Sequence, residues 1–272
     1  MFTADFDVIR ATVLAFIQGL TEFLPVSSSA HLILPSKLFG WDDQGLSFDM
    51  ALHLGTLIAV LIYYRKDLLA IALAIIRQLV QRQPSDESRL GWHLVLATIP
   101  AAVAGLLFEH EVETRLRSVH VIIVTTIFYG VLLGVADRMA LQTKSLGQMT
   151  WRTALVIGLA QMLAIIPGTS RSGITMTAAL FSNMKRADAA RFSFLLSIPT
   201  IGGAALLDMI ELLRSNSVNW HELLYAMTVS AIVAFFCIHY FLKLIAHISF
   251  IPFVIYRVLL GLVLLFIFGW GI

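Results

Sequence analysis

Charged residues are scarce in this chain of 272 residues. Asp, Glu, Lys and Arg make up only 13% of the sequence, whereas hydrophobic residues make up 58%. An average soluble domain carries about 25% charged residues, so the composition predicts an integral membrane protein. The basic residues lie in loops between apolar runs, and the net charge of +2 therefore gives no indication of nucleic-acid binding.

Cysteine is nearly absent as well. The one cysteine, Cys237, lies within an apolar run. A single cysteine excludes an intrachain disulfide and a cysteine-rich metal site. The first seven residues are acidic and lack the basic segment of a cleaved signal peptide. The sequence contains no low-complexity segment and no separate soluble domain, so we expect the functional residues to lie among membrane helices.

A proline interrupts the first apolar run. The run from Val8 to Leu24 has helical character and stops at Pro25, which lacks the amide hydrogen that a continuing helix needs. The serines that follow favour the start of a new helix over residues 30–38. Both pieces are near or below the ~20 residues that cross a bilayer. Irregular backbone at membrane depth requires cover from protein or a water-filled cavity, so we expect a re-entrant helix pair over residues 8–38.

The same pattern returns half a chain later. Gly158-Leu159-Ala160-Gln161-Met162-Leu163 repeats Gly19-Leu20-Thr21-Glu22-Phe23-Leu24, and after a short slip Pro167-Gly168-Thr169-Ser170-Arg171-Ser172 repeats Pro25-Val26-Ser27-Ser28-Ser29-Ala30. This spacing indicates an internal duplication.

We therefore expect an all-α integral membrane protein with an inverted repeat, in which each half holds one re-entrant helix pair and three transmembrane helices. The first repeat, residues 1–137, holds the pair 8–38 and spans at about 48–64, 92–108 and 119–136. The second, residues 151–272, holds the pair 151–181 and spans at about 192–213, 220–242 and 250–270. Residues 68–82 suggest a helix on the membrane surface, or a continuation of the preceding span into the headgroups.

The distribution of basic residues predicts the orientation. Three spans per half is an odd number, so consecutive halves must point in opposite directions across the membrane. Twelve of the nineteen Lys and Arg residues fall on one predicted side and five on the other. The richer side should be cytoplasmic. Both termini would then be extracytoplasmic, and the two breaks would enter from opposite sides and meet inside the bilayer.

Gln18 and Glu22 precede the first break. They are four residues apart and therefore share one helix face. An ionisable group at membrane depth is costly and usually functional. Glu22 is thus a candidate metal ligand or general base, and the structural alternative is a simple ion pair with an arginine of the same bundle.

Hydroxyl groups and a histidine follow the same break. Ser27, Ser28 and Ser29 are either helix caps or ligands of an anion, since a helix N-terminus binds phosphate well. His31 lies beside them and is a candidate for acid–base chemistry near neutral pH. His53 has no such neighbours in the sequence, and we expect it to be structural.

The second break supplies a cation. In Gly168-Thr169-Ser170-Arg171-Ser172-Gly173, glycines allow close approach of backbone amides and successive amides can form an anion-binding nest. The guanidinium of Arg171 suits phosphate oxygens, and the structural alternative is that it only neutralises Glu22. The second half has Gln161 where the first has Glu22, so the halves divide acid and cation between them, as a two-sided anion site requires. Arg257 interrupts the last span, where it either faces the same cavity or pairs with an acid.

Three motifs together closely resemble those of the bacterial undecaprenyl-diphosphate phosphatases of the bacitracin-resistance type. They are Gln18-x-x-x-Glu22, Pro25-Val26-Ser27-Ser28-Ser29-Ala30-His31 and Pro167-Gly168-Thr169-Ser170-Arg171-Ser172-Gly173. The resemblance covers essentially the whole chain. In that family the first motif begins with Glu or Gln, so Gln18 is an allowed variant that removes one possible carboxylate.

The resemblance implies a multi-pass enzyme of the bacterial plasma membrane. It would hydrolyse undecaprenyl diphosphate to the monophosphate and inorganic phosphate, recycle the lipid carrier of peptidoglycan synthesis and confer bacitracin resistance. A divalent cation, Mg²⁺ or Ca²⁺, would assist. The expected partners are the polyprenyl diphosphate substrate and membrane lipid, without nucleic acid.

On this interpretation Ser28 is the candidate nucleophile and His31 its proton partner, while direct attack by a water oriented by Glu22 or His31 is the alternative mechanism. The expected catalytic residues are Glu22, Ser28, His31 and Arg171. The expected substrate-binding residues are Gln18, Ser27, Ser29, Gly168, Thr169, Ser170 and Ser172, and the expected metal ligands are Glu22 and Gln18.

The competing function is a transporter or flippase of an anionic lipid or small anion, because broken helices in inverted repeats are a transporter layout. The combination of Ser28, His31 and Glu22 exceeds what anion binding requires and favours the enzyme. A purely structural membrane protein fits poorly with an acid and an arginine at membrane depth.

Overall fold

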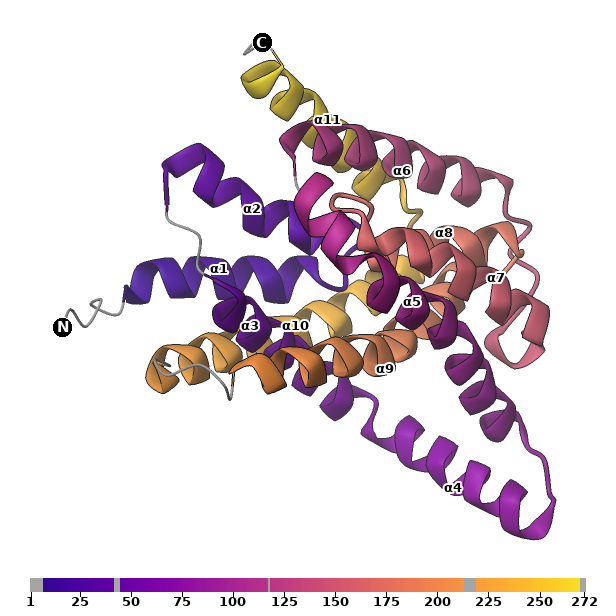
Figure 1. Cartoon of the computed structure of the whole chain (residues 1–272). Coiled ribbons are helices and arrows are strands. Elements are labelled where there is room, and N and C mark those ends of the chain that lie inside the picture. The colour runs from indigo at the N-terminus through magenta and orange to yellow at the C-terminus, as the bar shows by residue number, and fades with distance from the viewer. Residues whose placement is uncertain (1–6, 42–44, 117, 213–218, 270–272) are drawn as a thin grey trace.

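The computed structural model describes residues 7–41, 45–116, 118–212 and 219–269. Within these ranges the chain forms helices and no β-strand (Figure 1). The helices are α1 (Val8–Thr21), α2 (Ser28–Phe39), α3 (Leu46–Tyr63), α4 (Arg65–Gln81), α5 (Asp86–Arg115), α6 (Val119–Met139), η1 (Leu146–Gln148), α7 (Trp151–Gln161), η2 (Met162–Ile165), α8 (Arg171–Phe181), α9 (Arg186–Leu212), α10 (Trp220–Ile245) and α11 (Ile251–Phe268).

The outer surface of the bundle is apolar. Large side chains such as Leu106, Phe128 and Leu259 are 70%, 58% and 56% exposed. A soluble monomer rarely exposes so much contiguous apolar surface, whereas lipid tails solvate it. Five helices among the described residues, α5, α6, α9, α10 and α11, are long and apolar enough to cross a membrane. The prediction of an all-α membrane protein is confirmed.

Two of the predicted spans differ from the helices of the structure. The first, at about 48–64, is α3, which belongs with the shorter apolar helices. The second, at about 92–108, is only part of α5: this helix begins at Asp86, because Ser85 and Ser88 form a capping box, and it continues to Arg115. The polar residues at its ends mark the limit of the apolar segment, not of the helix. Within the predicted repeats, residues 1–6, 42–44, 117, 213–218 and 270–272 lie outside the described residues.

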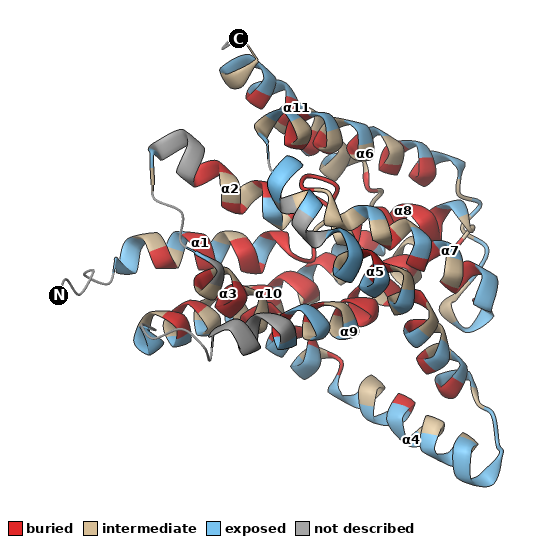
Figure 2. Cartoon of the chain, in the orientation of Figure 1, coloured by how far each residue is buried: buried red, intermediate tan, exposed pale blue. Residues whose placement is uncertain are grey.

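The segment 68–82 belongs to a helix of its own. The chain turns at Tyr64 between α3 and α4, and α4 then forms a hairpin with the first part of α5. Figure 1 shows this hairpin projecting from the bundle, and Figure 2 shows that most of α4 is exposed. The interpretation of this segment as a continuation of the preceding span is wrong.

Each predicted break separates two short helices. α1 and α2 flank the first break, and α7 with η2 and α8 flank the second. The N-cap residue of each new helix is a serine with positive φ, Ser27 at +74° for α2 and Ser170 at +72° for α8. Each hydroxyl accepts a hydrogen bond from the amide three residues later, which satisfies one of the donors left open at a helix start.

This common cap geometry corrects the pairing of the two breaks. Ser27 is the counterpart of Ser170, so Ser28 corresponds to Arg171. The prediction that Ser28 corresponds to Ser170 is therefore wrong by one residue. The loop ahead of Ser170 is longer, and matching the two prolines therefore shifts the residues that follow.

The two predicted repeats interlock. α1 packs on α10 and α7 packs on α5, so the first helix of each break contacts a long helix of the other half. Glycines permit both contacts: a Cβ at Gly19 would lie 2.7 Å from the Ser230 carbonyl oxygen, and one at Gly158 would lie 2.6 Å from that of Ala97. Small residues at such crossings let helix backbones approach closely in membranes. α8, almost wholly buried, lies at the centre (Figure 2).

We expect Gly158→Leu to reduce the yield of folded protein strongly, because its side chain would overlap the backbone of α5 at Ala97. Gly105→Leu is the matched control, since nothing lies within 4 Å of a Cβ at that position of α5. Size-exclusion chromatography and thermal unfolding in detergent measure both. Equal behaviour of the two variants would contradict the packing.

Candidate functional site

The two breaks meet in the interior of the bundle. Arg171 Nη2 donates a hydrogen bond of 3.0 Å to Glu22 Oε1, and the side chains of the pair are 13% and 6% exposed. Ser172 Oγ donates to the carbonyl of Leu24, 2.8 Å away. The acid of one half and the cation of the other therefore lie together, as the sequence analysis predicts.

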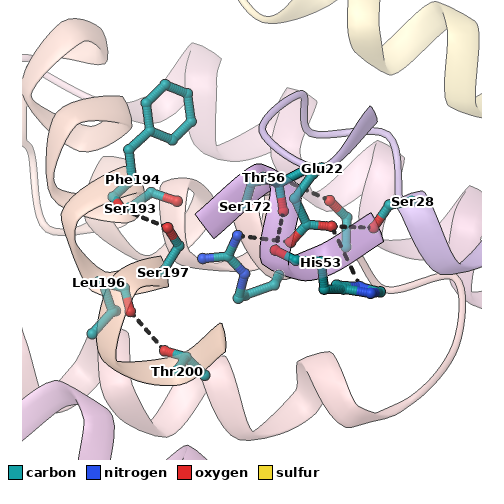
Figure 3. Close-up of polar contacts among 12 residues, drawn as sticks. Glu22, Ser28, His53, Thr56, Ser172, Ser193, Phe194, Leu196, Ser197 and Thr200 are labelled. Atoms are coloured by element: carbon teal, nitrogen blue, oxygen red, sulfur yellow. Dashed lines mark hydrogen bonds and ion pairs between the residues drawn. The ribbon is translucent and has the colours of Figure 1, made fainter. Parts of the chain in front are cut away.

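The second carboxylate oxygen of Glu22 accepts hydrogen bonds from polar side chains of the first half. Ser28 Oγ donates to Glu22 Oε2 at 2.6 Å and Gln18 Nε2 donates to the same oxygen at 2.9 Å. His53 Nε2 lies 3.8 Å from it (Figure 3). A carboxylate that already accepts the hydrogen bond of a hydroxyl is placed to take that proton when the hydroxyl attacks an electrophile.

Three of the predicted residues keep unused polar atoms inside the site. Gln18 Oε1, Thr169 Oγ1 and Arg171 Nη1 are buried without a hydrogen-bond partner. Buried polar atoms are almost always paired in native proteins, so such atoms indicate a place for a ligand. Arg171 uses only Nη2 on Glu22 and retains Nη1 for a further acceptor, which is more than neutralisation of the acid requires.

The structure places the two histidines differently from the order of the sequence. His31 Nδ1 donates to the carbonyl of Ser27 at 2.7 Å, and its Nε2 lies 2.5 Å from the hydroxyl of Tyr256, on which the ring also stacks. The structure thus turns His31 toward α11 and does not bring it to Ser28. His53, expected to be structural, is instead the histidine beside Glu22. The sequence, in which His53 has no polar neighbours, does not reveal this contact, because α3 is distant from the break along the chain.

The remaining predicted residues divide between backbone support and the site. Ser27 and Ser170 are caps, and Ser29 and Ser172 each lie 3.2 Å from the hydroxyl of the cap two residues before them. Gly168 has a φ of +86°, and a Cβ there would lie 2.2 Å from Thr125 Oγ1. The turn therefore requires glycine at position 168, because any other residue would be strained and would overlap Thr125.

The sequence leaves the role of Arg257 open, and the structure shows its partners. Its side chain is fully buried and donates to backbone carbonyls of both breaks, not to an acid. A polar residue within an apolar span was the available signal for both Arg257 and His53, and only the fold reveals their neighbours.

Hydroxyl groups of α9 extend the polar interior. Ser193 Oγ lies 2.7 Å from Thr175 Oγ1, and Thr200 Oγ1 donates to Gln161 Oε1 at 3.5 Å. In the view of Figure 3, Ser193 and Ser197 lie on the opposite side of Glu22 from Ser28. Gln161 bonds to α5 and α9 and so remains apart from the Glu22 cluster.

Comparison with known proteins assigns a family. The sequence profile of the family described as "Bacitracin resistance protein BacA" matches residues 11–263. The "Undecaprenyl-diphosphatase" of Teredinibacter turnerae is 54% identical over 264 residues, 96% of this chain and 99% of that protein. The protein of the same name from Hahella chejuensis is 56% identical over 254 residues, 93% and 95% of the two chains. The "Undecaprenyl-diphosphatase 1" of Pseudoalteromonas translucida is 54% identical over 256 residues, 94% and 96%.

We expect Arg171→Gln to destabilise the protein by about 3 to 5 kcal/mol, because it leaves the Glu22 carboxylate buried without its cation. Glu22→Gln in the same chain should recover much of that loss. Thermal unfolding of the two single variants and the double variant in detergent measures the coupling. Losses that simply add would show that the pair does not stabilise the junction of the breaks.

Proposed function

The chain belongs to the bacitracin resistance protein BacA family, and from this we infer that it hydrolyses undecaprenyl diphosphate to undecaprenyl phosphate and inorganic phosphate. The relatives that match nearly its whole length carry the name undecaprenyl-diphosphatase. One observation supports this chemistry above the others: the hydroxyl of Ser28 donates to the buried carboxylate of Glu22 at 2.6 Å. The reaction would return the lipid carrier to peptidoglycan synthesis and confer resistance to bacitracin.

In the proposed mechanism, Ser28 Oγ attacks the terminal phosphorus while Glu22 accepts its proton. The bond to the bridging oxygen breaks and undecaprenyl phosphate leaves. Water then hydrolyses the phosphoserine and releases inorganic phosphate. Ser28 is the first residue of α2, so the transferred phosphoryl group would lie at a helix N-terminus, where unpaired amides and the helix dipole favour negative charge. Glu22, which contacts the hydroxyl, replaces His31 as the proton acceptor.

Arg171 supplies the opposing charge. Its Nη1, which is buried without a partner, would bind a phosphoryl oxygen, as would the first amides of α8 that the Ser170 hydroxyl does not cap. Phosphoryl transfer depends chiefly on positioning and on neutralisation of charge in the transition state. A side chain with two separated donor groups can hold Glu22 with one and a phosphate oxygen with the other.

We also propose that Gln18 and Glu22 would hold a divalent cation, Mg²⁺ or Ca²⁺. Among the described residues no three His, Cys, Asp or Glu side chains gather as a metal site. A magnesium ion on a phosphate substrate nevertheless needs only one or two protein carboxylates, since phosphate oxygens and water complete its shell. The unpaired Gln18 Oε1 is an oxygen donor of the required kind beside the Glu22 carboxylate. When bound, the ion would neutralise phosphate charge.

The decisive test is phosphate release from undecaprenyl diphosphate by the purified protein in detergent, where no membrane is present to transport across. We expect Glu22→Gln and Ser28→Ala to lower kcat by at least ~10³-fold, as losses from units that act together do. Glu111→Gln and Ser182→Ala are the matched controls, since these residues lie on the exposed end of α5 and at the far end of α8.

The outcomes separate the alternatives. Binding without phosphate release by the unmodified protein would favour a transporter or flippase. Near-normal hydrolysis by Ser28→Ala, with Glu22→Gln inactive, would rule out the serine nucleophile and indicate direct attack by water. Near-normal hydrolysis by Glu22→Gln would remove the carboxylate from the mechanism.

We propose further that the two halves form an inverted repeat in the bacterial inner membrane, with both termini extracytoplasmic. The reciprocal packing of α1 on α10 and of α7 on α5 supports the repeat. In Figure 1, α1 begins and α11 ends away from the side where the α4–α5 hairpin projects. The excess of basic residues supports a cytoplasmic location of the hairpin side.

Cysteines introduced at either end of the chain test this topology. We expect an impermeant thiol reagent to label both in cells with a permeabilised outer membrane. Cys237 gives little background because it is 8% exposed. Protection of both ends would invert the proposed orientation, and labelling of only one end would contradict the odd number of spans per half.

A further inference from the structure

Arg257 is a permanently charged side chain buried without an acid. It lies on α11 and its relative exposure is 0%. None of the ion pairs among the described residues includes it. Burial of an unpaired charge is very costly unless dipoles replace its hydration, so the surroundings of Arg257 must be arranged for it.

Backbone carbonyls provide that arrangement. Nη2 donates to Gly168 O at 2.8 Å and to Thr169 O at 3.0 Å, both in the second break. Nη1 donates to Pro25 O at 3.3 Å in the first break. Two further bonds go to α6: Nε donates to Thr126 O at 3.1 Å, and Nη2 to Thr125 O at 3.4 Å. One guanidinium therefore holds both breaks and the helix beside them.

The neighbouring glycines leave room for this side chain. A Cβ at Gly130 of α6 would lie 2.9 Å from Arg257 Cβ, and one at Gly173 of α8 would lie 3.0 Å from Nη1. Either contact would push the guanidinium away from its carbonyls. Glycines on two separate helices, α6 and α8, thus leave space for the Arg257 side chain to extend from α11 to the breaks.

The orientation of a carbonyl fixes the orientation of the next amide. A peptide unit is planar and trans, so its N–H points opposite to its C=O. Because Thr169 O points to Arg257, the N–H of Ser170 points away from it, and no acceptor for this N–H occurs among the described contacts. Ser170 N–H then joins the first amides of α8, which have no partner within the helix. In the first break Arg257 holds Pro25 O, and the N–H of the same peptide, that of Val26, already donates to Leu24 O at 2.8 Å.

We propose that Arg257 is a positioning residue for phosphoryl transfer. It fixes the peptide plane ahead of Ser170 so that the amides at the start of α8 face the diphosphate, and through Pro25 O it ties the first break to the same guanidinium. This inference rests on the proposed function. It assigns to Arg257 the geometry of the anion site, whereas Arg171 contacts the anion itself. A lysine at this position would keep the charge but lose the planar fork that reaches five carbonyls.

Arg257→Ala and Arg257→Lys test the proposal. For the folded fraction of Arg257→Ala we expect kcat to fall about 100-fold or more, the size of a lost transition-state donor, with a smaller change in KM. Guanidinium at millimolar concentration should restore part of kcat, whereas methylammonium, a cation without the fork, should not. Arg257→Lys should lie between the alanine variant and the unmodified protein.

Arg186→Ala is the matched control. Arg186 also links distant elements, through its ion pair with Asp137, but it does not contact the breaks. We expect this variant to lose stability while its kcat per folded molecule stays unchanged with or without guanidinium. A fall in its kcat equal to that of Arg257→Ala would show that general loosening explains the effect and would overturn the proposal.

Other outcomes are equally decisive. A folded Arg257→Ala or Arg257→Lys variant with normal kcat would overturn the proposal, as would equal rescue by methylammonium, which would reduce the role of Arg257 to charge. If alanine prevents folding, the lysine variant decides. Calorimetric binding of inorganic diphosphate gives a readout independent of turnover. If the unmodified protein binds diphosphate without hydrolysing lipid diphosphate, the proposed function fails, and weaker binding by Arg257→Lys still supports the positioning role.

Discussion

A helix that ends inside a membrane leaves carbonyl and amide groups that lipid cannot hydrogen-bond. This protein has two such ends, and much of its interior satisfies them. Arg257 and Thr125 donate hydrogen bonds to the carbonyls ahead of α8. The hydroxyls of Ser27 and Ser170 accept hydrogen bonds from amides of the new helices. The first amides of α8 that remain belong to the helix that begins with Arg171. The two helix starts inside the bundle thus leave a set of amide donors with fixed orientation.

The helices that follow the two breaks begin with nearly the same cap conformation and carry different chemistry. Their cap residues match in conformation, but the first helical position holds Ser28 in one half and Arg171 in the other. The acid Glu22 corresponds to the amide Gln161, which bonds to α5 and α9 and stays outside the cluster. Similar scaffolds therefore present a hydroxyl with its acid on one side and a guanidinium on the other. A polar anion held between them contacts both.

Local sequence features predicted the breaks well. Pro25, Pro167 and the serines after them act on their immediate neighbours, so their effects are visible in the sequence. The meeting of Glu22 with Arg171 was also predictable, because an unpaired acid and an unpaired arginine at membrane depth each require a partner. The residue-by-residue match of the breaks was not, since it depends on the φ of two serines and not on the prolines.

The side chains brought in by other helices were harder to predict. His53 lies on α3 and reaches Glu22 only because α1, α3 and α10 pack together. His31 is close to Ser28 in sequence, yet it turns toward Tyr256 on α11. The ends of α5 were missed for another reason: its Ser85 cap starts the helix outside the apolar segment, and hydropathy reports only that segment.

The position of Arg257 and Tyr256 near the end of the chain has a consequence for biosynthesis. Every helix that carries Glu22, Ser28 and Arg171 leaves the ribosome before α11 does. Until α11 inserts, the carbonyls of both breaks lack their guanidinium and His31 lacks the hydroxyl it bonds. A nascent chain that stalls before this helix holds the reactive side chains without the frame that aligns them. On the proposed role of Arg257, the arrangement that cleaves a lipid diphosphate forms only after α11 has inserted.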